Sequence, residues 1–272
     1  MQAVSLPARA GSHWVQQGWK IFRTQPLAFF AWAMFVSMIL MLASVTPPLG
    51  PIIFVVVMPL VTFISLAACR TAASGQRLQP AMWLAPLRQP LVVRRLLSMG
   101  GLYMVVCLLF GLLAFMPFMT EIADAVQAAT ASNNLMPLLD AARTPMMIFG
   151  VLYVLLAAMF WYAPALVGWR GTSLVQSLFF SGIACWRNKW AFLVYGLVWG
   201  SIFMGIDLAT TLVVAIGLPE SIAASAQVPF NVIAGAVLYC SFYPSYVSVF
   251  EQPGAREEAD GAAPPPADQT PG

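Results

Sequence analysis

Asp207 is the acidic residue of the sequence that lies inside a long apolar run, from residue 191 to residue 217. It precedes Gly217 by ten residues, so a helical rise of about 1.5 Å per residue puts it about 15 Å from that end, near the middle of a bilayer. A charged carboxylate there costs at least about 2.5 kcal/mol. We therefore expect its carboxyl group to be protonated, hydrogen-bonded or hydrated.

Three hydroxyl groups are candidate partners of this carboxyl group. Thr210 and Thr211 follow Asp207 by one helical turn, and Tyr239 of the next apolar run is expected at a similar depth. Because hydroxyl groups can donate and accept hydrogen bonds, they suit a protonated acid. Two interpretations stay open: a proton or cation site in a transport pathway, and a structural contact between the last two spans.

Catalytic and metal-binding motifs are absent from the sequence. It contains no nucleophile elbow, HExxH, phosphate loop or EF-hand pattern, and His13 is its single histidine. The four cysteines lack the CxxC spacing of zinc sites: Cys69, Cys107, Cys185 and Cys240. General acid and base catalysis would lack its usual groups. We predict a protein that is not an enzyme and that holds no metal or other cofactor.

The composition indicates a membrane protein, since 60% of the 272 residues are hydrophobic and 8% are charged. Soluble domains have about 25% charged residues. Six apolar runs between residues 27 and 250 approach or exceed the length that crosses a bilayer: 27–46, 51–68, 98–118, 147–168, 191–217 and 228–250. The sequence predicts an all-α polytopic membrane protein with six transmembrane helices.

Basic residues are distributed unevenly over the segments that connect these runs. Twelve of the thirteen fall on the side of the termini, and Arg143 alone falls on the other side, which carries Glu121, Asp124 and Asp140. Lys and Arg are retained on the cytoplasmic side. We therefore predict a multi-pass protein of the bacterial inner membrane with its N-terminus and C-terminus in the cytoplasm.

Segments outside the six runs show three further patterns. The cytoplasmic N-terminus, residues 1–26, contains an amphipathic interfacial helix at 12–24, and residues 174–186 have the same helical periodicity. The last segment, 251–272, has five acids, one base and five prolines, which predicts a disordered tail. We expect none of these three segments to form a separate folded domain.

A weak internal repeat links the membrane edges. Trp19 and Pro26 are seven residues apart, as are Trp83 and Pro90, and Phe22-Arg23-Thr24 resembles Trp186-Arg187-Asn188. The pattern suggests three tandem units, each an interfacial segment followed by a transmembrane hairpin. Chance similarity among Trp, Arg and Pro at membrane edges explains it equally well, so both interpretations stay open.

Most of the chain up to Glu251 resembles an uncharacterised family of betaproteobacterial conserved integral membrane proteins, and the specific motifs lie in its first third. The residues that carry the resemblance are Gly18-Trp19-Lys20-Ile21-Phe22, Gln25-Pro26-Leu27, Pro48-Leu49-Gly50-Pro51, Pro59 and Cys69-Arg70. The resemblance implies a polytopic inner-membrane protein. It implies no activity and no functional residue.

Two sets of residues suggest interactions. Basic residues at the predicted membrane edge suit anionic lipids: Arg23, Arg88, Arg94, Arg95, Arg187 and Lys189. They are spread over three loops, so nucleic acid is not expected. Gly196 and Gly200 form a G-x-x-x-G pattern that favours close helix packing, within this chain or between copies.

These patterns lead to two hypotheses of function. The first is a non-enzymatic inner-membrane protein that acts in membrane assembly, lipid interaction or partner binding through its basic cytoplasmic face. The alternative is a small transporter or channel in which Asp207 takes up a proton or cation. They differ in whether water must reach Asp207.

Overall fold

The fold, taken from a computed structural model that describes residues 3–251, is helical throughout its regular secondary structure. Six helical segments are long and apolar enough to cross a bilayer, which confirms the predicted all-α polytopic membrane protein. The predicted disordered tail, apart from Glu251, lies outside the described residues. The elements are α1 (Ala10–Thr24), α2 (Pro26–Ser44), α3 (Leu49–Ala73), α4 (Pro80–Leu84), η1 (Ala85–Arg88), α5 (Pro90–Phe115), η2 (Met116–Phe118), α6 (Met119–Ser132), α7 (Met136–Phe160), α8 (Ala163–Arg170), α9 (Leu174–Arg187), α10 (Lys189–Ala215) and α11 (Glu220–Phe250).

The hairpin of α5, α6 and α7 is longer than the sequence predicted. Helical structure continues over Pro90–Ser132 and Met136–Arg170, although residues 119–146 were expected to form a connection between spans. The first of these segments has 43 residues, which at about 1.5 Å per residue is roughly twice the thickness of a bilayer core. The tip of the hairpin therefore projects beyond the membrane. Asn133, with a φ of 49°, ends α6 in the left-handed conformation.

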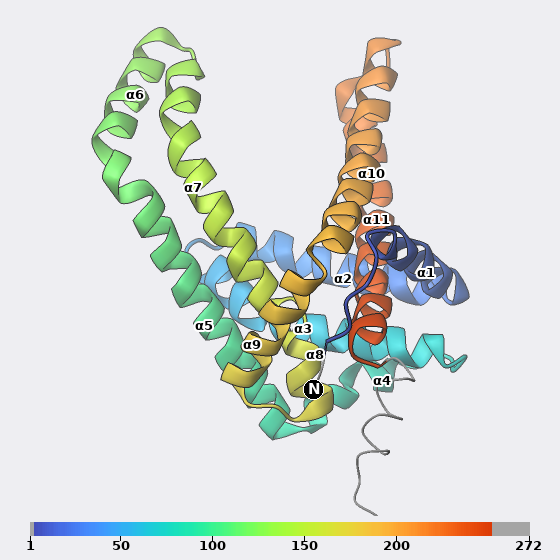
Figure 1. The fold of residues 1–272 in the computed structure, drawn as a ribbon. Coiled ribbons are helices and arrows are strands. Elements are labelled where there is room, and N and C mark those ends of the chain that lie inside the picture. The colour runs from blue at the N-terminus through green and yellow to red at the C-terminus, as the bar shows by residue number, and fades with distance from the viewer. Residues whose placement is uncertain (1–2, 252–272) are drawn as a thin grey trace, which may run out of the picture.

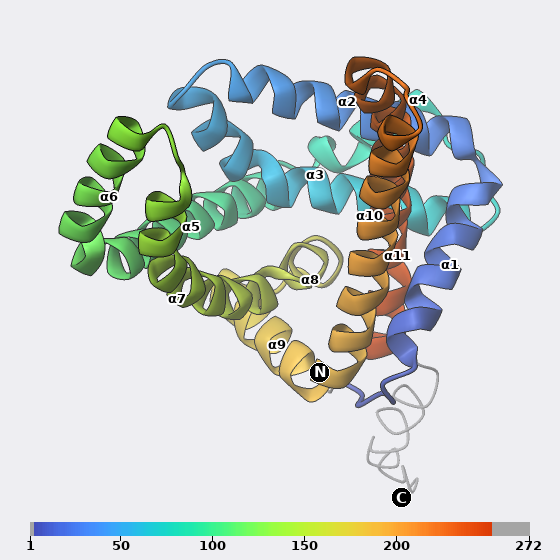
Figure 2. The same cartoon turned by 90° about the horizontal axis from the view of Figure 1, so that it is seen from above.

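The chain forms three units, each a short helical segment followed by a long hairpin. These are α1 with α2–α3, α4–η1 with α5–α7, and α9 with α10–α11. Helix α4 packs on α3, α9 packs on α7, and α1 packs on α11. Each short segment thus covers the second long helix of the preceding unit, and the three units close into a ring around α8 (Figure 2).

The hairpins diverge from this ring and do not form a parallel bundle. Figure 1 shows α5–α7 and α10–α11 separating toward their tips, and α2–α3 crossing α10–α11 at a steep angle. Consequently only 6% of the most apolar window of Lys189–Ala215 is buried inside the protein. Most of this apolar surface is left for lipid, a solvent in which such exposure carries no penalty.

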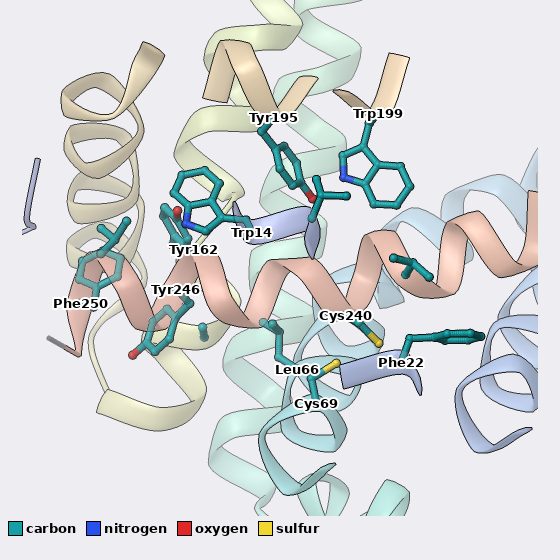
Figure 3. Close-up of a cluster of buried hydrophobic side chains, with 14 of the residues drawn as sticks. Trp14, Phe22, Leu66, Cys69, Tyr162, Tyr195, Trp199, Cys240, Tyr246 and Phe250 are labelled. Carbon is teal, nitrogen blue, oxygen red and sulfur yellow. The ribbon is translucent and has the colours of Figure 1, made fainter. Parts of the chain in front are cut away.

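Helix α1 is held in place by close contact with α10 and α11. The indole nitrogen of Trp14 donates to the hydroxyl group of Ser248 at 2.8 Å. A Cβ built at Gly18 would lie 2.6 Å from the Cβ of Ser241, so only glycine allows this crossing. Figure 3 shows Trp14 beside Tyr195 within the aromatic core. The apolar face of α1, expected to lie in the membrane interface, therefore packs mainly on protein.

Unlike α1, helix α9 has exposed apolar side chains on its outer face. The side chains of Val175, Phe179, Ile183 and Trp186 lie on the outside and are exposed. Ser173 caps the helix in a capping box with Gln176. An exposed apolar stripe on a helix that does not span the bilayer is typical of an interfacial helix.

Ser181 of α9 forms hydrogen bonds to the backbone at the break between α7 and α8. Its hydroxyl oxygen accepts from the backbone N–H of Tyr162 at 2.9 Å and donates to the carbonyl of Ala158 at 2.8 Å. These two backbone groups lose their helical partners because α7 ends at Phe160 and α8 begins at Ala163. A neighbouring serine thus satisfies irregular backbone inside the protein, as a membrane protein requires.

Candidate functional site

The basic residues that the sequence selected gather at the three junctions between a short segment and the following long helix. Arg23 lies in the last turn of α1, Arg88 ends η1, and Arg187 ends α9. Arg94 and Lys189 lie in the first turns of α5 and α10, and both side chains are exposed. The structure therefore arranges residues that are up to 166 positions apart, 23 to 189, around one ring.

Aromatic side chains accompany the bases at the α9–α10 junction. The ammonium group of Lys189 lies 4.9 Å from the ring centroid of Trp186 and 5.9 Å from that of Trp190. These indoles are 69% and 63% exposed. Tryptophan with this exposure and a neighbouring cation is typical of the headgroup level of a bilayer. The α9–α10 junction thus combines a cation with two exposed indoles.

Arg95 has a structural partner, unlike the other predicted lipid contacts. The residue is half-buried, and its guanidinium group donates to the carbonyl of Gly171 at 2.9 Å, in the segment that precedes α9, through a bond exposed to solvent. This bond joins the second unit to the third. Arg95 thus has a structural role, and the prediction that it also contacts lipid stays a prediction.

Two arginines that sequence reasoning did not select lie near the end of α11. Arg70 stacks on Trp169, with 5.3 Å from its guanidinium carbon to the ring centroid. Arg170 donates to the hydroxyl group of Tyr246 at 3.4 Å and to the carbonyl of Phe250 at 2.9 Å. The second bond satisfies an orphan carbonyl at a helix C-terminus. In the sequence, each of these arginines directly follows a residue that packs well in a protein core, in Cys69-Arg70 and Trp169-Arg170. This pattern was the signal that could have identified them.

Asp207 lies on the exposed surface of α10, and its partner was not predicted. Gln227 of α11 donates from its side-chain nitrogen to Oδ1 of Asp207 at 2.5 Å. The hydroxyl groups of Thr210 and Thr211 donate instead to backbone carbonyls four residues earlier in α10. Back-bonding of this kind satisfies a threonine within its own helix. The carboxylate is thus held by an amide rather than by the predicted hydroxyl groups.

Tyr239 does not lie beside Asp207, which corrects the predicted cluster. It follows Gln227 by twelve residues in α11, about 18 Å along a helix. Its ring instead packs against Phe242, and its backbone carbonyl lies 4.0 Å from the sulfur of Cys69. The depth of Tyr239 in the membrane was estimated from the predicted ends of the last two apolar runs. This estimate was wrong because α11 begins eight residues earlier than the predicted residue 228.

Gly196 and Gly200 do not meet another helix in the described part of the chain. A Cβ built at either position has no heavy atom within 4 Å. Close packing occurs at other glycines, since a Cβ at Gly11 would meet the carbonyl of Ala191 and one at Gly100 would meet that of Val56. Of the two alternatives, packing within the chain is not seen at these glycines in the described residues, and packing between copies stays a prediction. This face of α10 points outward because the hairpins diverge.

A cavity of about 310 Å³ lies between α2, α3 and α11. Its exposed edge includes Ser37 and Asn231, and its inner wall includes Cys69 and Cys240, whose thiols lie side by side (Figure 3). Asp207 is not among its lining residues. The lining is mostly apolar, as in pockets for apolar ligands.

The cysteines form no disulfide and no metal site within residues 3–251. Cys69, Cys107, Cys185 and Cys240 are free, and no group of three metal-binding side chains gathers in this range. On the interfacial helix α9, burial raises the pKa of the Cys185 thiol to about 12, and the neighbouring side chain of Ser181 opposes this shift. Cys185 is therefore an unreactive thiol at neutral pH.

Comparison with known proteins identifies one informative relative. The chain is 34% identical over 266 residues to a probable inner membrane protein of Burkholderia thailandensis, covering 94% of this chain and 97% of the relative. No family model and no solved structure matches. The relative's name confirms the predicted inner-membrane location and states no activity.

Proposed function

We propose that this chain, which belongs to the same family as that probable inner membrane protein of Burkholderia thailandensis, has a non-enzymatic function as a binder of anionic lipid. Binding occurs at the three junctions, on the cytoplasmic leaflet. The observation that supports this most directly is the placement of exposed bases at all three junctions: Arg23, Arg88, Arg94, Arg187 and Lys189.

The physical basis is electrostatic attraction at the membrane surface. A base close to an anionic leaflet contributes about 1 kcal/mol, and a guanidinium group can bind a phosphate in bidentate geometry. The indoles of Trp186 and Trp190 set the depth of the α9–α10 junction at the headgroups. Three junctions on one ring give the protein three such contacts with one leaflet.

Purified protein and lipid provide the test. Native mass spectrometry would compare binding of phosphatidylglycerol and phosphatidylcholine to the intact protein and to a variant carrying Arg23→Gln, Arg88→Gln and Arg187→Gln. At about 1 kcal/mol per base, each substitution should weaken phosphatidylglycerol binding at its junction about fivefold. Phosphatidylcholine binding should change little.

A matched control separates position from net charge. The control compares Arg23→Gln alone with Arg143→Gln, a variant that removes the same charge from an exposed site in α7 away from the junctions. We expect Arg143→Gln to retain phosphatidylglycerol binding. Equal loss in both variants, or no preference for the anionic lipid in the intact protein, would overturn the proposal.

Transport through Asp207 is the alternative hypothesis. Its carboxylate already has an amide partner in Gln227, and it does not line the cavity between α2, α3 and α11. Labelling of Asp207→Cys by a membrane-impermeant maleimide, in protein without its four native cysteines, tests access of water. Labelling would favour transport, whereas protection would favour a structural role.

A further inference from the structure

The cavity between α2, α3 and α11 lies against the parts of α2 and α3 that are nearest the α1–α2 junction, as its lining residues Phe29 and Cys69 show. Its lining begins on α2 at Phe29, three residues after the first residue of that helix, and extends to Ser37. On α11 the lining runs from Val228 to Cys240, about 18 Å along the helix. A length of this order and an apolar wall suit a hydrocarbon chain.

The cavity has an exposed edge and a closed floor. Ser37, Val228 and Asn231 are exposed, whereas Cys69 and Cys240 are at most 1% exposed. Figure 3 shows these two cysteines beside Phe22, which packs against Phe29 with ring centroids 6.4 Å apart. An occupant therefore enters sideways from the bilayer and rests on the buried thiols. Lipid surrounds this edge in the membrane, and an empty apolar cavity forgoes dispersion contacts.

Polar groups near the junction end of the cavity indicate which lipid fits. The hydroxyl group of Tyr239 has no hydrogen-bond partner among the described side chains and backbone groups, although the residue lines the cavity beside Cys69. It can donate to an ester carbonyl. Arg23 lies three residues before Pro26, where α2 begins, and is exposed. Because Phe22, which precedes Arg23, packs against the cavity-lining Phe29, this end of the cavity lies next to the α1–α2 junction.

We propose that the cavity binds one acyl chain of a phospholipid whose phosphate is held by Arg23 at the α1–α2 junction. The proposal rests on the proposed function, because it assigns one defined lipid site to one of the three basic junctions. It adds a chain-binding pocket that surface attraction alone does not provide.

Gly235 allows the cavity to be filled without disturbing the helices around it. It lines the cavity, and a Cβ built there has no heavy atom within 4 Å. Gly205 of α10 is equally free of neighbours and does not line the cavity. Gly235→Leu and Gly205→Leu therefore form a matched pair, since both replace a helical glycine by a better helix former.

The experiment measures phosphatidylglycerol retained by each purified protein, using native mass spectrometry after stepwise washing with detergent. We expect one tightly held lipid per chain in the unaltered protein and in Gly205→Leu, and at least tenfold weaker retention in Gly235→Leu. Arg23→Gln should reduce retention about fivefold, from about 1 kcal/mol per base. Equal retention by both leucine variants, or no retained lipid in the unaltered protein, would overturn the proposal.

A short-chain lipid separates failure of this proposal from failure of the proposed function. Dihexanoyl phosphatidylglycerol carries the same headgroup with chains too short to fill the cavity. If it binds in preference to its phosphatidylcholine counterpart while Gly235→Leu retains long-chain lipid normally, the cavity proposal fails and the proposed function stands. If one long-chain lipid is retained without any headgroup preference, the Arg23 contact and the proposed function fail.

Discussion

The side-chain amide of Asn188 ties the N-terminal segment to the α9–α10 junction, and its removal should destabilise the protein measurably. Its nitrogen donates to the carbonyls of Val4 and Ala184, both at 2.9 Å, and its oxygen accepts from the N–H of Leu6 at 2.8 Å. Asn188 is 1% exposed, so water cannot replace these bonds. At about 1 kcal/mol for each bond, Asn188→Ala should lower the free energy of unfolding by about 3 kcal/mol.

The side-chain amide of Gln25 makes two similar bonds in the first unit, one to a backbone carbonyl and one from a backbone N–H. Gln25 donates to the carbonyl of Gln76 at 2.8 Å and accepts from the N–H of Leu78 at 2.7 Å, in the segment that precedes α4. The bond to Gln76 is exposed to solvent, and the bond from Leu78 is partly buried. Gln25→Ala should therefore cost less, about 1 kcal/mol, because water can take the place of the amide.

Thermal unfolding in detergent would measure both effects against Gln16→Ala, which alters an exposed side chain of α1. A loss of about 3 kcal/mol corresponds to a decrease in Tm of roughly 6–12 °C for a chain of this size. Tryptic cleavage after Arg9 should also accelerate in Asn188→Ala, because the segment before α1 is released. If Asn188→Ala matched Gln16→Ala in both assays, the inferred contribution of the amide would be refuted.

Three further predictions concern other parts of the molecule. Gly100→Ala should cost about 1–3 kcal/mol because its Cβ meets the backbone of α3, whereas Gly101→Ala, with open space, should be neutral or stabilising in thermal unfolding. Asp207→Asn should retain most of the thermal stability, since an amide oxygen can still accept from Gln227. Because burial raises the pKa of Cys185 to about 12, its maleimide labelling should stay slow from pH 7 to 9 and become fast after denaturation; rapid labelling of folded protein would contradict this burial.

The six spans were predictable because length and hydrophobicity alone decide whether a helix can cross a bilayer. The positions of the bases at helix junctions also follow from the sequence, since Pro26 and Pro90 stand at the first position of α2 and α5. Proline suits that position because the first turn of a helix needs no backbone donor there. Each of these signals depends only on residues that are close together in the sequence, so it can be recognised without knowledge of the tertiary structure.

Contacts between units could not be predicted in the same way. Periodicity identified the apolar face of α1, but it could not show that Trp14 would meet Ser248, 234 positions away. The glycine pattern at Gly196 and Gly200 indicates a surface suited to close approach, and whether a helix lies there depends on how the hairpins diverge. Tyr239 was assigned to the wrong depth because helix ends, rather than helix existence, are uncertain in a sequence.

The repeat gained support that the sequence could not give. Asn188 and Gln25 each end a short helix and bind the backbone that precedes the short helix of the following unit around the ring. Arg95 of the second unit contacts the corresponding segment before α9, at Gly171, through a guanidinium group. Two of the three junctions therefore share an amide that binds the backbone of the next unit, which favours the repeat over chance similarity of membrane-edge residues.

Side-specific thiol labelling tests most directly whether the three basic junctions lie together on the cytoplasmic side. Arg23→Cys, Arg88→Cys and Arg187→Cys would be made one at a time in protein without its native cysteines, with Asn133→Cys as the marker of the opposite end. An impermeant maleimide should label all three junctions only in vesicles that expose the cytoplasmic face, and Asn133→Cys only in vesicles of the reverse orientation. Labelling of any junction together with Asn133→Cys would contradict the account.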